Sequence, residues 1–294
     1  ISIISFISLQ SCVENGCTDP NASNYSITAS KDDGSCQYET NLTKSGVISS
    51  DETWETGNVY YLQGRVVVDN NVTLTIQPGV IIKAKQGTES NASALIVSRG
   101  GKINAQGTAG NPIIFTSELD NIELGDVSGT TLQRTDNEKW GGIAILGKAP
   151  VSTENGDTEG NLEGIPANLG YGSYGGNIPN DNSGVFSYVS IRHGGVSIGE
   201  GNELNGLTLA GVGSNTTINN IEIYATLDDG IEFFGGTVNV NNILVYFQGD
   251  DGIDIDQNYS GTITNFAVYQ GDGIGTDEGL EIDGYEGSTY TQGS

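Results

Sequence analysis

Basic residues and methionine are scarce in this chain of 294 residues. It contains no methionine, one histidine, and 11 lysines and arginines against 37 aspartates and glutamates, for a net charge of −26. A surface with so few cations cannot neutralise a phosphate backbone, which excludes nucleic acid as a partner. No lysine or arginine follows Arg192, whereas 16 acidic residues do. That part of the chain is expected to repel polyanions unless a divalent cation mediates the contact.

The two ends of the chain also lack expected features. Without a methionine, the sequence is expected to begin inside a longer protein. Residues 285–294 offer no obvious cap, which predicts further chain beyond them. The apolar run Ile1–Leu9 is too short to span a bilayer and fits the end of a secretory signal.

Helical periodicity is missing as well. In its place, 44 glycines and several turn dipeptides separate apolar segments of three to five residues. Such short segments between turns are typical of strands. They are Val66–Val68, Leu74–Ile76, Val80–Ile82, Leu95–Val97 and Ile113–Phe115. The fold class is therefore expected to be all-β.

A repeat in the C-terminal part specifies which β fold. Tyr224, Tyr246 and Tyr269 each end a similar strand phrase, at spacings of 22 and 23 residues. A period of this length predicts a solenoid, here a right-handed parallel β-helix of roughly ten rungs over residues 46–294. Asn220, Asn242 and Asn265 begin the same phrases and are expected to form a ladder at a bend. Segments near 118–139 and 151–183 are too long for turns and are predicted to stand off the coil as loops.

Four further motifs carry a family resemblance. They are Leu74-Thr-Ile-Gln-Pro-Gly-Val80, Arg99-Gly-Gly-Lys-Ile103, Asn111-Pro-Ile-Ile-Phe-Thr-Ser117 and Trp140-Gly-Gly-Ile143. As a set they resemble the pectate-lyase-like, right-handed parallel β-helix proteins of Bacteroidetes cell envelopes. The resemblance implies an exported or surface lipoprotein, in a family whose activity is mostly unassigned.

The N-terminal residues Leu9-Gln-Ser-Cys12 resemble a bacterial lipoprotein signal. This resemblance implies that residues 1–11 are a signal remnant and that Cys12 carries the lipid. Outer-membrane lipid of a Gram-negative bacterium would then be a partner, with the protein exported and anchored or displayed at the cell surface. Cys17 and Cys36 would remain to form a disulfide within a tether of residues 12–45. The alternative is a truncated ordinary signal peptide with an incidental cysteine.

Acidic residues recur at one corner of successive repeats. Asp228-Asp-Gly230, Asp250-Asp-Gly252 and Asp277-Glu-Gly279 are variants of one phrase. Aspartates before glycine can simply cap turns. Stacked carboxylates repel one another, however, and a calcium ion would relieve that repulsion. The candidate calcium ligands are Asp229, Asp251, Asp254, Asp256, Glu278 and Glu281.

Catalysis is the third interpretation of these acids. Gly249-Asp-Asp-Gly-Ile253 resembles the paired-aspartate strand of polygalacturonase-type glycosidases, which implies inverting hydrolysis by Asp250 and Asp251, with Asp229 nearby. The Gly-His-Gly and Arg-Ile-Lys segments of that family do not follow. A pectate-lyase route would need a basic residue beside calcium, and this part of the chain has none. The single histidine, His193, is read as a turn residue, or else as a sugar or metal contact.

Tyrosines are the remaining candidates for ligand binding. Tyr171 and Tyr174 lie in the second long loop, where they could stack on sugar rings; the tyrosines of the repeat could do the same or pack a corner. The expected protein is a surface-displayed, non-catalytic adhesion or glycan-binding rod stabilised by calcium, its partners being glycans or another surface protein. A polysaccharide-degrading enzyme and a structural envelope component are the alternatives.

Overall fold

The chain forms two compact units, Ile1–Asn41 and Leu42–Ser294. A computed structural model describes residues 13–20, 22, 24–36, 42–199, 202–271 and 276–284. In the first unit, β1 (Asn15–Gly16) pairs in parallel with β2 (Lys31–Asp32). Cys17 and Cys36 form the predicted disulfide. Residues 1–11 and Cys12, on which the signal and lipid predictions rest, lie outside the described residues.

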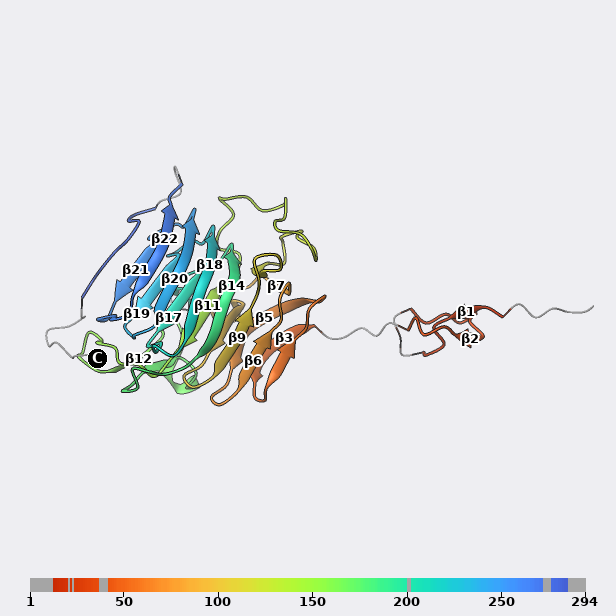
Figure 1. The fold of residues 1–294 in the computed structure, drawn as a ribbon, viewed down its shortest axis with the longest axis horizontal. Helices are drawn as coiled ribbons and strands as arrows, with labels where there is room; N and C mark the ends of the chain where they lie inside the picture. Colours follow the sequence, from red (N-terminus) through yellow and green to blue (C-terminus); the bar gives the residue numbers. More distant parts are fainter. Residues whose placement is uncertain are drawn as a thin grey trace, which may run out of the picture. The chain divides into compact units, whose positions relative to one another are not determined.

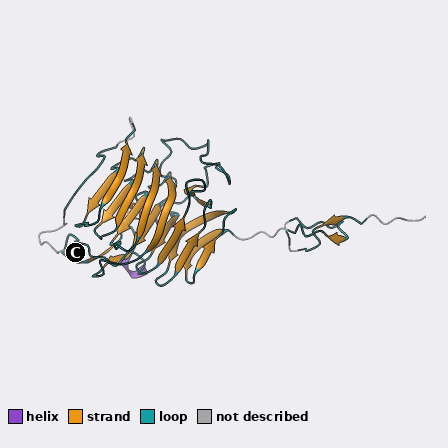
Figure 2. Ribbon diagram, in the orientation of Figure 1, coloured by secondary structure: helices purple, strands orange, loops and turns teal. Residues whose placement is uncertain are grey.

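Strands joined by turns and loops are the main regular elements of the second unit (Figures 1 and 2). They are β3 Thr43–Ile48, β4 Glu52–Trp54, β5 Val59–Val68, β6 Thr73–Ile76, β7 Ile81–Ala84, β8 Ala94–Val97, β9 Lys102–Gln106, β10 Ile113–Ser117, β11 Gly142–Leu146, β12 Glu159–Asn161, β13 Ser173–Gly175, β14 Gly184–Arg192, β15 Ser197–Gly199, β16 Asn202–Glu203, β17 Leu207–Ala210, β18 Thr217–Tyr224, β19 Ile231–Phe234, β20 Asn239–Tyr246, β21 Ile253–Asp256 and β22 Ile263–Tyr269. Two single-turn 3₁₀ helices, η1 Glu89–Asn91 and η2 Ala167–Leu169, complete the set.

Sixteen of these strands form one coiled parallel sheet with three faces. The first face contains the start of β5, then β7, β10 and the C-terminal halves of β14, β18, β20 and β22. The second face contains the ends of β3 and β5, followed by β8, β11, β17, β19 and β21. The third face contains β4, β6, β9 and the N-terminal halves of β14, β18, β20 and β22.

This topology confirms the predicted parallel β-helix. On the second face, an eighth level follows the seven strands, because the backbone N–H groups of Glu281 and Asp283 donate to the carbonyls of Ile253 and Ile255 at 3.0 and 2.9 Å. The described coil has somewhat fewer levels than the roughly ten expected, since segments 118–139 and 151–183 use many residues without adding rungs. The tyrosine register is as predicted: Tyr224 pairs with Tyr246, and Tyr246 with Tyr269.

Side chains that alternate along each strand build the core inside the coil. Ile221, Ile223 and Val245 point inward and are almost fully buried. Trp54 and Trp140 are completely buried in the same cluster. Neighbouring rungs hydrogen-bond to each other along the coil axis. Equivalent outward-facing residues on successive rungs are therefore held about 4.8 Å apart.

The corner between the third and first faces carries the predicted asparagine ladder. Asn220, Asn242 and Asn265 all adopt left-handed backbone conformations, with φ of 54°, 58° and 54°. Their amides are linked: Asn242 Nδ2 donates to Asn220 Oδ1 at 3.1 Å, and Asn265 Nδ2 donates to Asn242 Oδ1 at 3.3 Å. Asparagine tolerates this conformation better than other non-glycine residues, so one residue type supplies both the bend and the ladder.

Parts of both long segments pack against the coil, although most residues of 121–139 are exposed. In residues 151–183, Leu162 and Ile165 are buried in a second apolar cluster with Ile96, which points outward from the second face. In residues 118–139, Ile122 is fully buried among Ile81 and Ile114 on the outside of the first face. Apolar side chains on the outer surface of the sheet therefore hold both segments in place.

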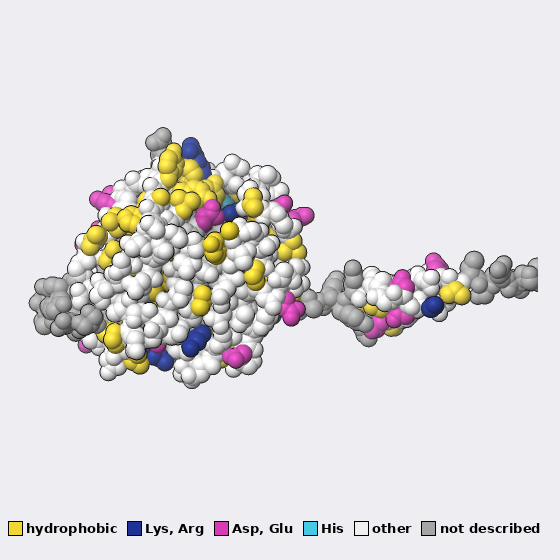
Figure 3. Space-filling model, in the orientation of Figure 1, with side chains coloured by type: hydrophobic (Ala, Val, Ile, Leu, Met, Phe, Trp, Pro, Cys, Tyr) yellow, Lys and Arg dark blue, Asp and Glu magenta, His cyan; other side chains and the backbone are white. Residues whose placement is uncertain are grey.

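Within the described residues, no helix is long and apolar enough to cross a membrane. The face of the molecule shown in Figure 3 presents a group of hydrophobic side chains, with basic ones beside it, over the ends of β18, β20 and β22.

Candidate functional site

The acidic phrases lie in register at the corner where the chain enters the second face. Gly230 N donates to the carbonyl of Asp251 at 2.9 Å, and Gly252 N donates to the carbonyl of Glu278 at 3.1 Å. These bonds stack Asp229, Asp251 and Glu278 on successive rungs, as the sequence predicts.

Two of these carboxylates cap the rung above them. Asp251 N donates to Asp229 Oδ1 at 2.9 Å, and Glu278 N donates to Asp251 Oδ1 at 2.5 Å. These bonds join neighbouring rungs and do not cap the aspartates' own turns, and Gly230 and Gly252 do not adopt the positive φ that the turn-capping interpretation expects. Each cap uses one carboxylate oxygen, so Asp229 keeps its second oxygen for other contacts.

A second acidic column follows on the strands themselves. Glu232 on β19 pairs in register with Asp254 on β21, and both are flanked by inward-facing apolar residues. Oxygens of Asp229, Glu232 and Asp254 all lie within 4.8 Å of one another. Asp254 is 8% exposed, and its Oδ1 is buried without a hydrogen-bond partner among the described residues. We refer to Asp229, Glu232 and Asp254 as the carboxylate cluster.

Burial and mutual repulsion both disfavour the ionised forms of this cluster. Burial, followed by the charge of Asp228, raises the pKa of Asp229 to about 8. Burial also raises the pKa of Glu232 well above its usual range, with Asp229 as the next cause. The pKa of Asp254 rises to about 6, again mainly through burial. Two unit charges 4.8 Å apart, the upper limit of the separations within the cluster, repel by about 3 kcal/mol at an effective dielectric constant of 20.

A cavity of about 320 Å³ opens beside the cluster, lined in part by Asn205, Thr208, Asp229, Glu232 and Asp256. Asn205 lies one rung before Asp229, because Gly206 N donates to the carbonyl of Asp229 at 2.9 Å. Its Nδ2 donates to Glu232 and to Thr208 Oγ1, whereas its Oδ1 is buried and unpartnered within the described chain. The site thus holds two orphaned oxygens, one carboxylate and one amide.

These donors fit a hard cation. Calcium takes six to eight oxygen ligands at 2.3–2.6 Å from carboxylates, amide carbonyls and water. Among the described residues that line the cavity there is no histidine or cysteine, so the set does not suit zinc. A divalent cation bound by the carboxylate cluster would satisfy the orphaned oxygen of Asp254 and offset the burial and repulsion that raise the pKa values.

Sequence reasoning located most, but not all, of this site. Asp229, Asp254 and Asp256 were candidate ligands and line or form it, whereas Glu232 and Asn205 were not among them. The sequence signal for Asn205 is the segment Leu204-Asn-Gly-Leu-Thr-Leu209, which aligns with Asp228-Asp-Gly-Ile-Glu-Phe233. In this alignment Asn205 takes the place of Asp229, and Thr208 takes the place of Glu232. A search restricted to acidic residues passes over that rung.

The other candidate ligands lie one or two levels further along the axis. Glu278 is exposed, and a hydrogen bond with Asp277 raises its pKa. Glu281 is also exposed, and its pKa is raised to about 7, first by a hydrogen bond with Asp251. Asp250 is exposed and belongs to a second group, with oxygens within 4.8 Å of those of Asp228 and Asp229.

The structure does not bring the two loop tyrosines together at the surface. Tyr171 lines a separate cavity of about 770 Å³, and its hydroxyl accepts a hydrogen bond from Arg65 Nη1 at 3.3 Å. Tyr174 is 4% exposed, packs against Phe234 and has its hydroxyl 3.2 Å from Gln257 Oε1. The geometry of Tyr174 is that of a packing residue that holds the loop to the coil.

His193 has the geometry of a turn residue. Its φ is 63°, it is 2% exposed, and its Nδ1 lies 2.6 Å from the carbonyl of Asp136. Burial lowers its pKa, so the ring is neutral at neutral pH. The Tyr224 ring packs edge-on against the imidazole, with the two ring centroids 5.2 Å apart.

Comparison with known proteins agrees with the fold. A family model described as a pectate-lyase-like beta helix domain matches residues 46–293. Searches of curated proteins and of solved structures found no match.

Proposed function

Because the chain belongs to the pectate-lyase-like β-helix family, we propose that it binds acidic polysaccharide through a calcium ion held by the carboxylate cluster, without cleaving it. The observation that carries the proposal is the buried, unpartnered oxygen of Asp254 beside two further carboxylates. With calcium in place, its open coordination positions would accept the carboxylates of a uronate chain, which the acidic surface alone repels.

Binding without cleavage is supported by what surrounds the cluster. The cavity-lining residues that the structure describes include no lysine, arginine or histidine that could remove a proton from a uronate ring. Hydrolysis is the second candidate, favoured by the spread between the pKa values of Asp229 and Asp254. Inverting hydrolases, however, hold their two carboxyl groups about 6.5–9.5 Å apart, wider than the separations of this cluster. Of the predicted catalytic pair, Asp251 accepts a hydrogen bond from Glu278 N, and Asp250 is exposed.

Calcium should raise the melting temperature of the protein, and EDTA should reverse the change. Ligand at 100 times its dissociation constant stabilises a fold by about 2.7 kcal/mol, which corresponds to a shift of about 5 °C or more for a domain of this size. Asp254→Asn keeps the shape of the side chain but removes its charge, so the shift should disappear. Glu154→Gln changes an exposed acid that forms no part of the cluster and should retain the shift.

Polysaccharide binding is then measured by affinity electrophoresis in gels containing polygalacturonate or alginate. We expect retardation with calcium and none with EDTA or with Asp254→Asn. New reducing ends or unsaturated products would show that the protein cleaves the polysaccharide and would refute binding without cleavage. An unchanged melting temperature in calcium would refute the cation site itself.

We also propose that the protein is exported and displayed on the cell surface of a Gram-negative bacterium through lipid on Cys12. The Cys17–Cys36 disulfide is consistent with an oxidising compartment. The full-length precursor, expressed in a Gram-negative host fed labelled palmitate, should incorporate the label and fractionate with outer membranes. Cys12→Ser should lose both properties. Label retained by Cys12→Ser would refute the assignment.

A further inference from the structure

A second groove lies on a different face of the coil from the carboxylate cluster. It has a volume of about 740 Å³ and is bounded by the C-terminal halves of β14, β18 and β20 on one side and by residues 127–133 on the other. Four aromatic side chains line it, Tyr188, Tyr224, Tyr246 and Phe247. It shares no lining residue with the cavity beside the cluster.

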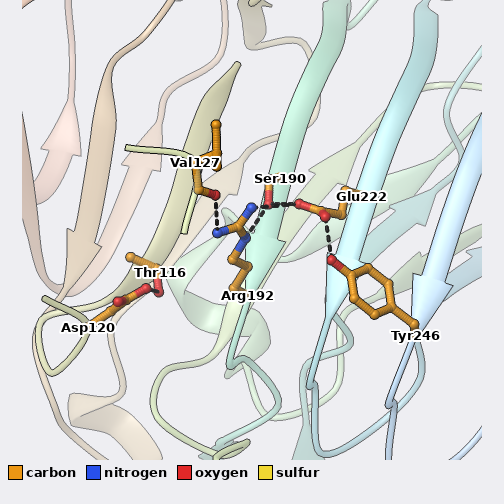
Figure 4. Close-up of polar contacts among 7 residues, drawn as sticks. All are labelled: Thr116, Asp120, Val127, Ser190, Arg192, Glu222 and Tyr246. Atoms are coloured by element: carbon orange, nitrogen blue, oxygen red, sulfur yellow. Dashed lines mark hydrogen bonds and ion pairs between the residues drawn. The ribbon is translucent and has the colours of Figure 1, made fainter. Parts of the chain in front are cut away.

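Arg192 holds the covering loop in place, so the groove is preformed. Figure 4 shows its guanidinium between the loop and the sheet. Nη1 donates to the carbonyl of Val127 at 2.8 Å, Nη2 to Glu222 Oε2 at 2.9 Å and Nε to Ser190 Oγ at 2.7 Å. From the loop side, the guanidinium of Arg134 lies 5.3 Å from the ring centre of Phe247.

The charged side chains that line the groove, Arg192, Glu222 and Asp120, all form hydrogen bonds within the protein. Glu222 pairs with Arg192 and accepts further hydrogen bonds from Ser190 and Tyr246. Burial alone would raise the pKa of Glu222, but Arg192 and these hydrogen bonds lower it overall and keep it ionised. Asp120 accepts from Thr116 Oγ1 at 3.0 Å and from the backbone N–H of Ile122 at 3.2 Å. His193 is neutral. Among the described residues that line the groove, none therefore carries the unpaired positive charge that a polyanionic ligand would require; Arg134 lies against Phe247 but is not one of the lining residues.

Tyr188 occupies a position where the ladder predicts asparagine. It lies between Ser187 and Val189, which pair with Asn219 and Ile221, so it is level with Asn220 on the next rung. Its φ is 50°, a conformation that is unfavourable for a bulky aromatic residue. The side chain is 37% exposed and lines the groove. A residue that breaks a local rule without a packing benefit is expected at a functional position.

We propose that this groove binds a neutral oligosaccharide, with a sugar ring stacked on Tyr188. A sugar combines an apolar ring face with a polar rim, which matches aromatic faces beside hydrogen-bonding groups. The hydroxyls of Tyr188 and Tyr224 form no hydrogen bond within the described chain and can bind ligand hydroxyls. This site needs no cation, and it therefore extends beyond the calcium-dependent binding proposed above.

Tyr188→Asn is the decisive variant, because it removes the ring while installing the residue that the ladder already uses. The protein should fold, with a melting temperature equal to or above that of the wild type. Binding is screened on an array of uncharged glycans in EDTA and quantified by calorimetry with the best-bound oligosaccharide. Tyr188→Asn should weaken that binding about tenfold or more.

Two control variants establish whether the binding belongs to this groove. Tyr25→Asn removes a tyrosine of similar exposure from the first unit and should bind normally. Asp254→Asn should also bind normally, so failure of the calcium proposal would leave this result intact. The proposal is overturned if no neutral glycan binds, if Tyr188→Asn binds as tightly as wild type, or if the groove instead mediates self-association that Tyr188→Asn abolishes in sedimentation.

Discussion

At the scale of single residues, a few side chains determine where the coil can bend. Asn242 satisfies two requirements at once: it adopts a φ of 58°, and its amide both donates to Asn220 and accepts from Asn265. Each neutral hydrogen bond contributes about 1 kcal/mol, and a left-handed conformation costs other non-glycine residues about 1–2 kcal/mol. Both contributions depend on the same side chain.

Asn242→Ala should therefore lower the free energy of unfolding by about 2–4 kcal/mol. Asn242→Gly is the matched control, because glycine accepts the left-handed conformation and loses only the amide bonds. We expect the glycine variant to lie between the alanine variant and the wild type in guanidinium denaturation. Equal stability of the alanine and glycine variants would show that backbone conformation is not limiting at this corner.

At the scale of elements, periodicity decided how much could be predicted. Tyr224, Tyr246 and Tyr269 recur at nearly constant spacing, and the register of β18, β20 and β22 follows from that spacing alone. The stacked acids could be placed for the same reason. The Cys17–Cys36 bond followed from cysteine number and the lipoprotein resemblance, not from geometry.

Contacts made by non-periodic segments could not be predicted in this way. Arg192 ends a strand, but its partner Val127 lies in a loop whose path no repeat constrains. The packing of residues 151–183 was missed for the same reason: Tyr174 looks like a surface residue until its burial against Phe234 is known. Asn205 was missed because it occupies the position equivalent to Asp229 on its own rung but carries an amide, whereas the repeat was recognised by its acids.

At the scale of the whole molecule, charge is unevenly distributed along the coil. The rungs after Arg192 contain only acids among their formally charged residues. Each added rung places further carboxylates above the last, so repulsion accumulates along the axis while the hydrogen-bonded rungs hold the separation fixed. The same stack provides a multidentate oxygen site at its most buried point, and stability should therefore depend jointly on pH and calcium.

Without calcium, the free energy of unfolding should fall as pH rises from about 4 to about 8. Asp229 has a pKa of about 8 in the folded protein, against 3.8 as its ordinary value, and that of Asp254 is about 6. The folded state then binds more protons than the unfolded state across this window, so raising the pH favours unfolding. Four pKa units correspond to an upper bound of about 5 kcal/mol for Asp229 alone.

Guanidinium denaturation at several pH values, in EDTA and in saturating calcium, tests this dependence. In calcium the fall should be reduced or reversed, because the cation binds the ionised carboxylates and its affinity rises with pH. Asp229→Asn should flatten the EDTA curve while still accepting the hydrogen bond from Asp251 N, and Asn205 shows that an asparagine fits the equivalent position one rung earlier. Stability in EDTA that rises with pH over this window would contradict the buried, protonated cluster, because ionisation would then be favoured in the folded state.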